Sequence, residues 1–211
     1  MKTIVWDWNG TLLDDLAVCN GILNDMLVPR GIPRVEREKY REIFRFPVSD
    51  YYREAGFDFE KEPFPVLAEE FTALYAAREG ECPIHPGLVE TLEALGKAGY
   101  RQEILSATRR EDLLRQVEAR GVAPLFKEIS GTGTILAHGK SDLARAWAEE
   151  HAKKEETVWF VGDTPHDAEV AEIMGAEILL VSWGHVSRER LLACGKPVFD
   201  TPEELRAYWR V

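Results

Sequence analysis

The sequence predicts an α/β fold in which helices cover both faces of a parallel sheet and an all-helical segment follows the first strand. Three observations support this fold class. A short β-branched and aromatic run stands near the start of the chain at Thr3–Trp6. Residues 84–211 alternate strand-like apolar runs with amphipathic helical patterns, as parallel sheets do. Residues 15–83 show helical patterns and no convincing strand.

The strands are expected at short apolar runs that end in turn residues. The first run, Thr3–Trp6, leads into Asp7 and the turn pair Asn9-Gly10. The later strands are predicted, in chain order, at Glu103–Leu105, Lys127–Ile129, Val158–Val161 and Ile178–Val181, with a short edge strand at Val198–Phe199.

The helices are expected from apolar residues spaced three and four apart. This spacing predicts helices over residues 87–98 and 110–120 and a third after Lys140. Thr108 and Glu111 have the spacing of a capping box at the start of the second helix. Thr201-Pro202 begins a final helix. Within the insert, helices are predicted around residues 16–28, 35–44, 50–55 and 66–77.

Composition and charge exclude several classes of partner. The chain has 211 residues, a formal net charge of −11 and a pI near 5.0. An acidic surface repels nucleic acid and anionic membranes, so neither is an expected partner. The three cysteines lack CxxC spacing, and no apolar run is long enough for a signal peptide or a membrane span. We therefore expect a cytoplasmic protein with free thiols.

Two acidic segments follow predicted strands. Asp7 follows the first strand, where Gly10 lets backbone N–H groups approach an anion; a simple strand-to-turn corner is the alternative. Asp163 ends a later strand, before Thr164 and Asp167, which have the spacing of a helix cap. Asp167 thus has a structural explanation, whereas Asp163 has none. Asp7 and Asp163 converging at one sheet edge would form an oxygen site suited to Mg²⁺.

Two further segments offer groups for an anion. Ser106-Ala107 stands at a strand end before a helix, where a hydroxyl and N–H groups can hold phosphate oxygens. Lys140 stands at a predicted helix start, where its charge opposes the helix dipole and needs a compensating anion. A solvated surface lysine is the alternative for Lys140.

These four segments, in this order, resemble the signature of the haloacid dehalogenase-like hydrolase superfamily. The signature is an aspartate nucleophile in a DxDGT loop, a strand-end Ser or Thr, a Lys, and a GDxxxD-type acidic loop. The resemblance covers the whole chain and implies a Rossmann-like three-layer core with a small helical cap, similar to the phosphoglycolate phosphatase subgroup. It implies a core of residues 1–14 and 84–211 and a cap of residues 15–83.

The resemblance also implies roles for the site residues. Asp7 would attack phosphorus and form an aspartyl-phosphate, with Lys140 assisting. Asp7, the backbone carbonyl of Asn9, and Asp163 would hold Mg²⁺, with support from Thr164 and Asp167. The residues implied to bind the phosphoryl group are Gly10, Thr11, Ser106, Ala107 and Lys140. The expected partner is a small phosphorylated metabolite, with a phosphoglycolate-like phosphate monoester as the implied substrate, and the chain is expected to be a monomer or a homodimer.

One position departs from the signature. The family phosphatases carry a second Asp two residues after the nucleophile as the acid and base, and here that residue is Asn9. Turnover could be slow, or His166, His138 or a cap residue could supply the proton. The chain could instead be a phosphonate hydrolase, phosphomutase or dehalogenase of the same superfamily, or a phosphate-binding or interaction protein with little catalysis.

Substrate selection is expected from the cap and from the strand-end loop. Arg45 and Phe46 stand in a turn of the insert that reaches the active site in similar caps, and Arg109 follows Ser106 closely. An arginine at either place would suit a second anionic group on the substrate. A surface turn is the alternative for Arg45 and Phe46.

Overall fold

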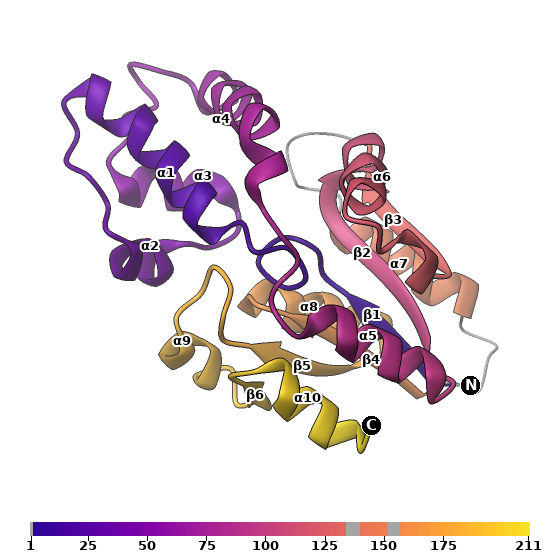
Figure 1. The fold of residues 1–211 in the computed structure, drawn as a ribbon. Helices are drawn as coiled ribbons and strands as arrows, with labels where there is room; N and C mark the ends of the chain where they lie inside the picture. Colours follow the sequence, from indigo (N-terminus) through magenta and orange to yellow (C-terminus); the bar gives the residue numbers. More distant parts are fainter. Residues whose placement is uncertain (1, 134–139, 152–156) are drawn as a thin grey trace.

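The computed structural model describes residues 2–133, 140–151 and 157–211. Its strands form one parallel sheet in the order β3-β2-β1-β4-β5-β6 (Figure 1). The strands are β1 Lys2–Trp6, β2 Arg101–Arg109, β3 Glu128–Thr132, β4 Thr157–Gly162, β5 Glu177–Val181 and β6 Val198–Phe199. The predicted fold class is confirmed, and β2 is longer at both ends than its apolar run indicated.

The helices fall into an insert and a core set. Between β1 and the core helices lie α1 Leu16–Leu27, α2 Arg37–Ile43, α3 Val48–Ala55 and α4 Phe64–Arg78. The core helices are α5 Leu88–Lys97, α6 Arg110–Ala119, α7 Lys140–His151, α8 Pro165–Met174, α9 Arg188–Leu192 and α10 Pro202–Trp209. Short 3₁₀ turns occur at Val28–Arg30, Glu79–Glu81 and Ala123–Leu125. No helix among the described residues has the length and apolar character needed to cross a bilayer.

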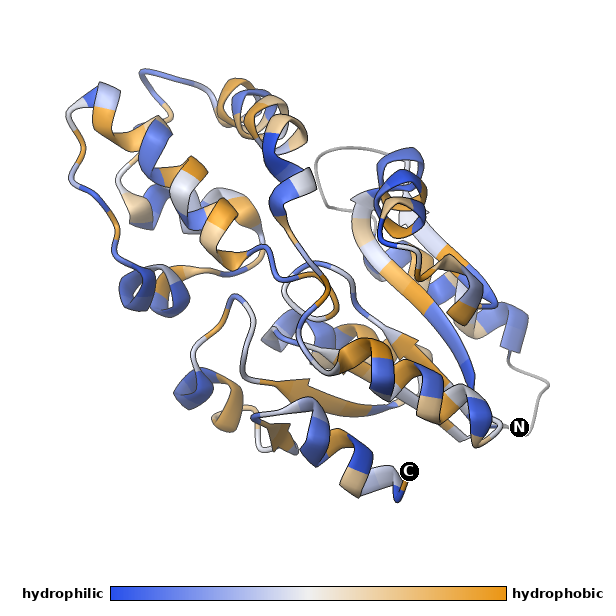
Figure 2. Ribbon diagram, viewed as in Figure 1, coloured by the Kyte–Doolittle hydropathy of each residue, from blue (hydrophilic) through white to orange (hydrophobic). Residues whose placement is uncertain are grey.

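The sheet separates two apolar cores. Side chains alternate along β1, so Ile4 and Trp6 pack with α5, α6 and α10, while Val5 packs with α7, α8 and α9. All three are fully buried. A strand that is covered on both faces reads as a continuous apolar run, which is why β1 was visible in the sequence. Figure 2 shows the apolar residues concentrated on the strands and the inner helix faces.

Two predicted helix starts have different outcomes. At α8, Thr164 accepts from the N–H of Asp167 and the reciprocal bond is present, so the predicted capping box is confirmed. At α6, the capping box predicted from Thr108 and Glu111 is wrong, because the N-cap is Arg109 and no side chain caps the helix. Thr108 lies inside β2, and its hydroxyl donates instead to Oδ1 of Asn9 at 2.6 Å.

The helical insert has an apolar cluster of its own. Fully buried members of that cluster run from Leu16 to Leu67, within α1–α4 and their connections. The chain enters and leaves the insert side by side, because the N–H of Asp14 donates to the carbonyl of Pro83 at 2.8 Å and His85 N–H donates to Leu12 at 2.9 Å. The insert therefore joins the sheet through two adjacent, hydrogen-bonded connections, above the carboxyl ends of the strands (Figure 1).

Candidate active site

Two carboxylates lie at the carboxyl ends of the two central strands. Asp7 follows β1 and Asp163 follows β4, and these strands are neighbours in the sheet. The N–H of Asp7 extends the pairing by donating to the carbonyl of Val161 at 2.9 Å. Both carboxylates are buried, with exposed fractions of 7% for Asp7 and 0% for Asp163. The strand order thus brings together two residues that are far apart in the sequence, as open α/β sheets do at their binding edge.

Lys140 bridges two of the acidic residues. Its Nζ lies 2.5 Å from Oδ1 of Asp7 and 2.5 Å from Oδ1 of Asp167. Burial opposes the charge on Lys140, but the two carboxylates outweigh it and raise the pKa of the ammonium. The anions that the sequence required at this helix start are therefore these two carboxylates.

The acidic residues outnumber the single ammonium. Carboxylate oxygens of Asp7, Asp163 and Asp167 lie within 4.8 Å of one another. Burial raises the pKa of Asp7 although Lys140 opposes it, and the charges of Asp167 and Asp163 add to the rise. Burial also raises the pKa of Asp163, with Asp167 adding to the rise and His185 opposing it. A divalent cation with oxygen preference would supply the missing charge, so this donor set fits a metal such as Mg²⁺.

Close backbone packing fixes the position of Asp163. Gly10 has φ +74°, and a Cβ there would overlap the Asp163 carboxylate and the His185 ring. A Cβ at Gly184 would overlap the same carboxylate. The hydroxyl of Thr11 donates to Oδ1 of Asp163 at 3.0 Å, and the N–H of His185 donates to Oδ2 at 2.6 Å. Asp163 therefore has one available orientation.

Two residues expected to bind phosphate are used elsewhere. The N–H of Gly10 donates to Oδ1 of Asp15 at 2.9 Å, and the Thr11 hydroxyl holds Asp163. Neither residue lines the cavity that contains Asp7, whereas Ser106 and Ala107 do. For Gly10 and Thr11 the structure shows a role in shaping the loop, and phosphate binding by them stays a prediction.

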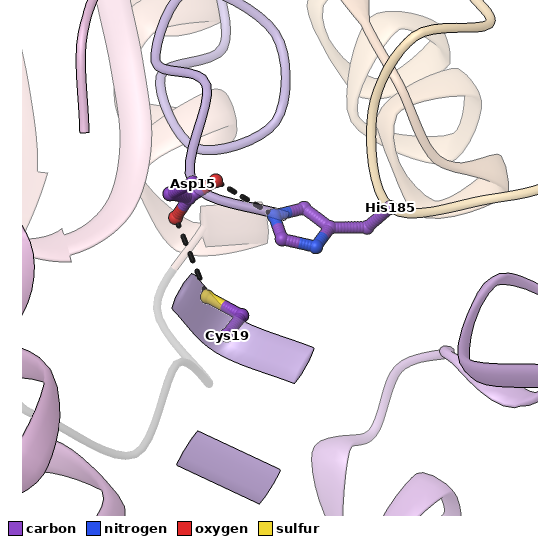
Figure 3. A group of neighbouring side chains, drawn as sticks. All are labelled: Asp15, Cys19 and His185. Carbon is purple, nitrogen blue, oxygen red and sulfur yellow. Dashed lines mark hydrogen bonds and ion pairs between the residues drawn. The ribbon is translucent and has the colours of Figure 1, made fainter. Parts of the chain in front are cut away.

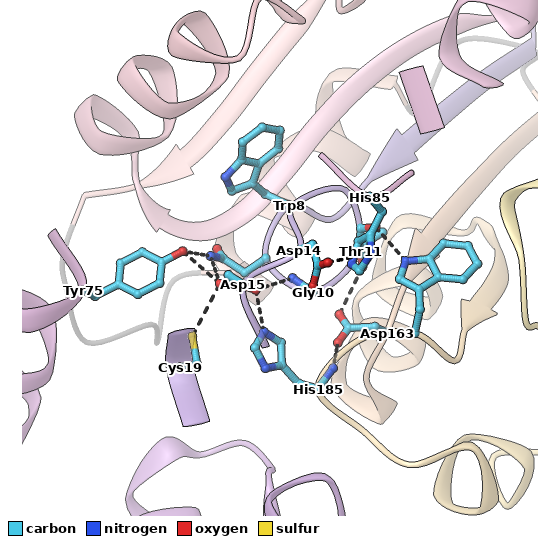
Figure 4. A network of polar contacts seen from close by, with 12 residues as sticks. Trp8, Gly10, Thr11, Asp14, Asp15, Cys19, Tyr75, His85, Asp163 and His185 are labelled. Atoms are coloured by element: carbon cyan, nitrogen blue, oxygen red, sulfur yellow. Dashed lines mark hydrogen bonds and ion pairs between the residues drawn. The ribbon is translucent and has the colours of Figure 1, made fainter. Parts of the chain in front are cut away.

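The amide of Asn9 is fully engaged by neighbouring side chains. Its Oδ1 accepts from Thr108, and its Nδ2 donates to Oδ2 of Asp15 at 2.8 Å and to the hydroxyl of Tyr75 at 2.9 Å. Figure 4 shows Asp15 and Tyr75 meeting beside the Gly10 loop. Asn9 thus joins the loop that follows β1 to Asp15, at the start of α1, and to Tyr75 on α4.

The chain is similar to known proteins over most of its length. The family of haloacid dehalogenase-like hydrolases matches residues 4–181 of the chain. The chain belongs to this family. It is 25% identical to a phosphoglycolate phosphatase of Synechococcus elongatus, over 97% of this chain and 95% of that protein. It is 28% identical to a phosphoglycolate phosphatase of Caulobacter vibrioides, over 87% of this chain and 80% of that protein.

Solved structures show the same fold. A haloacid dehalogenase-like hydrolase from Streptococcus pneumoniae superimposes with a TM-score of 0.82 at 20% identity, covering 98% of this chain and 97% of the other. The protein tyrosine kinase A of Mycobacterium tuberculosis superimposes with a TM-score of 0.80 at 24% identity, covering 99% and 98% of the two chains. These likenesses cover the helical insert as well as the sheet.

A second buried cluster of this hydrolase was not foreseen from its sequence. Nε2 of His185 lies 2.9 Å from Oδ1 of Asp15, and the Cys19 thiol donates to Oδ2 of Asp15 at 3.5 Å (Figure 3). Burial disfavours the imidazolium, but the Asp15 carboxylate overrides it and raises the pKa of His185 to about 9. Tyr75 also donates to Asp15, at 2.9 Å. With this many donors around one carboxylate, we interpret the cluster as an ion pair that braces the Asn9 loop.

His185 could have been identified from the sequence by its position after a predicted strand. Ser182 to His185 directly follow β5, and the carboxyl ends of parallel strands carry the binding loops. Asp15 and Tyr75 carry no comparable signal, because they meet Asn9 only through the packing of α1 and α4.

The specificity candidates separate in the structure of the hydrolase. A cavity of about 260 Å³ contains Asp7, and both Phe46 and Arg109 line it. Arg45 is not among its described lining residues, because its guanidinium pairs with Glu54 at 2.5 Å. His166 is also absent from that lining and pairs with Glu169 at 2.8 Å. His138 lies outside the described residues.

Proposed function

We propose that this hydrolase is a Mg²⁺-dependent phosphatase that transfers the phosphoryl group of a small phosphate monoester to Asp7. The observation that most strongly supports this proposal is the position of the Lys140 ammonium. It lies 2.5 Å from Asp7 and from Asp167, beside the buried Asp163. Phosphoryl transfer needs positioning and neutralisation of charge rather than elaborate covalent chemistry. The matched relatives that are named phosphoglycolate phosphatases support the same reaction class.

The residues divide the work of the proposed reaction. An oxygen of Asp7 forms a bond to phosphorus while the bond from phosphorus to the leaving oxygen breaks, and water then hydrolyses the aspartyl-phosphate. Lys140 and Ser106 bind phosphoryl oxygens. Mg²⁺ would be held by Asp7, the backbone carbonyl of Asn9, and Asp163, and it would neutralise the phosphoryl charge. Asp167 keeps Lys140 in place.

Asn9 limits the esters that the proposed phosphatase can hydrolyse rapidly. An amide neither donates a proton as a carboxylic acid does nor accepts one near neutral pH, and general acid–base catalysis is worth roughly 10²–10⁴-fold. We therefore expect slow turnover of esters whose leaving group needs a proton. The same residue favours the second candidate function, a phosphate-binding protein with little catalysis.

The experiment is hydrolysis of p-nitrophenyl phosphate, whose leaving group needs no proton, with Mg²⁺ and with EDTA. We expect Mg²⁺-dependent turnover that falls by at least about 10³-fold in Asp7→Asn, as is usual when a nucleophile is removed. Asp142→Asn is the matched control, because the Asp142 side chain is 78% exposed on α7 and, among the described residues, forms an ion pair with Arg145 alone. Phosphate binding without turnover in the wild type would favour the second candidate.

We further propose that residues 1–14 and 84–211 form the core and residues 15–83 form a cap over the site. The separate apolar cluster of α1–α4 and the adjacent connections at Asp14 and His85 support this division. We expect this cap to open on these two connections when substrate enters, so Mg²⁺ with orthovanadate should change the proteolysis of residues 14–15 and 82–85. Identical proteolysis with and without them would contradict such opening.

A further inference from the structure

The cap side of the active-site cavity is a wall of aromatic side chains. On α4, residues spaced three and four apart face the cavity, as one stripe of a helix does. The rings of Phe71 and Tyr75 lie nearly parallel, with centroids 6.1 Å apart. The aromatic residues that line the cavity are Tyr40, Phe44, Phe46, Tyr51, Tyr52, Phe64, Phe71 and Tyr75.

The stripe on α4 is held against the reacting end of the cavity. The Tyr75 hydroxyl donates to Asp15 at 2.9 Å and accepts from Asn9 at 2.9 Å, two residues beyond Asp7. Phe71 therefore lies one helical turn from a residue that touches the site loop. An apolar group joined to a phosphate at Asp7 would extend along Tyr75 and Phe71, which line the same cavity.

Much of this wall is not covered by protein. Within α4, all of whose residues the structure describes, Leu67 is the only fully buried side chain. Phe64, Phe71 and Tyr75 are partly exposed, although they are large and apolar. Apolar surface left open inside a cavity that also holds polar groups at one end is typical of a small-molecule site.

The cations that line the cavity already have carboxylate partners. Arg109 pairs with Asp112 at 2.8 Å, and Arg115 pairs with Asp112 at 2.8 Å and with Glu79. Lys140 is held between two aspartates.

The charge balance of the cavity is unfavourable for a second anion. His185 pairs with Asp15, so each lining cation in the described chain is matched. Carboxylates outnumber protein cations by six to four among the described lining residues, so the Mg²⁺ of the proposed function would balance them without leaving a positive surplus. A carboxylate on the leaving group would lose its hydration there without gaining an unpaired cation.

We propose that the substrate's leaving group is an uncharged alcohol carrying an aromatic or similarly apolar group, which packs on the ring stripe of α4, and that phosphoglycolate is a poor substrate. This inference depends on the proposed phosphatase function. It departs from the substrate named for the matched relatives because the lining contains aromatic rings where a glycolate carboxylate would need a free cation.

The test compares three phosphate esters of primary alcohols: benzyl phosphate, ethyl phosphate and phosphoglycolate, each with Mg²⁺. We expect kcat/KM for benzyl phosphate to exceed that for ethyl phosphate by about 10- to 10²-fold, the range that an apolar pocket provides. Phosphoglycolate is expected at or below ethyl phosphate. A kcat/KM for phosphoglycolate above that for benzyl phosphate would overturn the inference.

Variants on α4 locate the effect. Phe71→Ala should lower the ratio of benzyl to ethyl phosphate about 10-fold, because it removes a cavity-lining ring of α4 and leaves the hydrogen bonds of Tyr75 to Asn9 and Asp15 in place. Val66→Ala is the matched control, because Val66 is on the same helix, is 51% exposed and does not line the cavity. An unchanged ratio in Phe71→Ala, with an intact circular dichroism spectrum, would count against the α4 stripe.

Binding measurements keep this inference separate from the proposed function. The probes are benzylphosphonate, ethylphosphonate and phosphonoacetate, which carry a non-hydrolysable carbon–phosphorus bond, titrated by calorimetry with Mg²⁺. If no ester is hydrolysed, the proposed phosphatase fails, yet tighter binding of benzylphosphonate still supports the apolar subsite. Tighter binding of phosphonoacetate would reject it even in an active enzyme.

Discussion

The two ends of the active-site cavity differ in their side chains: one end is charged and the other is aromatic. The sheet end holds Asp7, Asp163, Asp167 and Lys140, all buried and held by short hydrogen bonds or ion pairs. The cap end is aromatic and is carried by helices that form the core of the insert but leave Phe64, Phe71 and Tyr75 partly exposed at the cavity. Under the proposed function, the sheet end would carry out the reaction and the cap end would select the substrate.

The sheet end leaves little freedom of composition. Strand order brings β1 and β4 together, and Gly10 and Gly184 permit the close approach that orients Asp163. The cap end needs only apolar volume on one helical stripe, which many sequences can supply. We therefore expect substitutions at the sheet end to change the reaction for every substrate, and those on the α4 stripe to change the order of preference.

Among the substitutions that follow, Lys140→Met is expected to lower activity most. Removal of the ammonium leaves Asp7 and Asp167 without their shared partner, and the phosphoryl group loses a donor. We expect kcat to fall by about 10²–10³-fold for every ester, as with removal of a donor that stabilises transition-state charge.

The control for that variant lies on the same helix. Arg145 is exposed and pairs with Asp142, so Arg145→Met should keep the activity of the wild type. Loss of activity toward benzyl phosphate alone in Lys140→Met would contradict the division between the two ends.

Asn9→Asp adds a carboxylic acid where the sheet end and the cap end of the cavity meet. We expect a gain of about 10- to 10²-fold on ethyl phosphate, at or below the lower limit of the 10²–10⁴-fold that general acid–base catalysis usually provides. The gain is limited because the new carboxylate would face Asp15, to which the amide now donates at 2.8 Å. The gain on p-nitrophenyl phosphate should be smaller, since that leaving group needs no proton.

The Asn9→Asp measurement is a comparison of kcat for the two esters at one Mg²⁺ concentration. No gain on either ester would remove Asn9 as the cause of slow turnover.

The ion pair of His185 and Asp15 connects the sheet end of the cavity to the cap end. We expect this pair to affect the free energy of unfolding. The pKa of His185 is raised from 6.5 to about 9, with burial opposing and Asp15 favouring the charge. A raised pKa stabilises the fold fully below about pH 6.5, and that contribution disappears as the pH rises through 9. The change amounts to at most about 3 kcal/mol in the free energy of unfolding.

Urea denaturation of the wild type and His185→Gln in EDTA, from pH 6 to pH 10, measures this contribution. We expect the difference in stability between the two proteins to shrink as the pH rises. Parallel stability curves would show that the pair carries no net charge interaction.

The sequence predicted the sheet end better than the cap end. Strands buried on both faces are visible as apolar runs, and the carboxyl ends of such strands identify Asp7 and Asp163 as neighbours. Thr108 was misassigned as a helix cap because its partner, Asn9, is distant in the chain. The contacts of Asp15 and Tyr75 with Asn9 depend on how α1 and α4 pack over the loop, which local patterns do not encode.

The central claim is that Asp7 accepts the phosphoryl group. The most direct measurement is acid quenching of the Mg²⁺-loaded enzyme during turnover of p-nitrophenyl phosphate, followed by peptide mass spectrometry. We expect a phosphoryl adduct on Asp7 that disappears with hydroxylamine and is missing in Asp7→Asn. Turnover with no adduct on Asp7, or with the adduct on another residue, would contradict it.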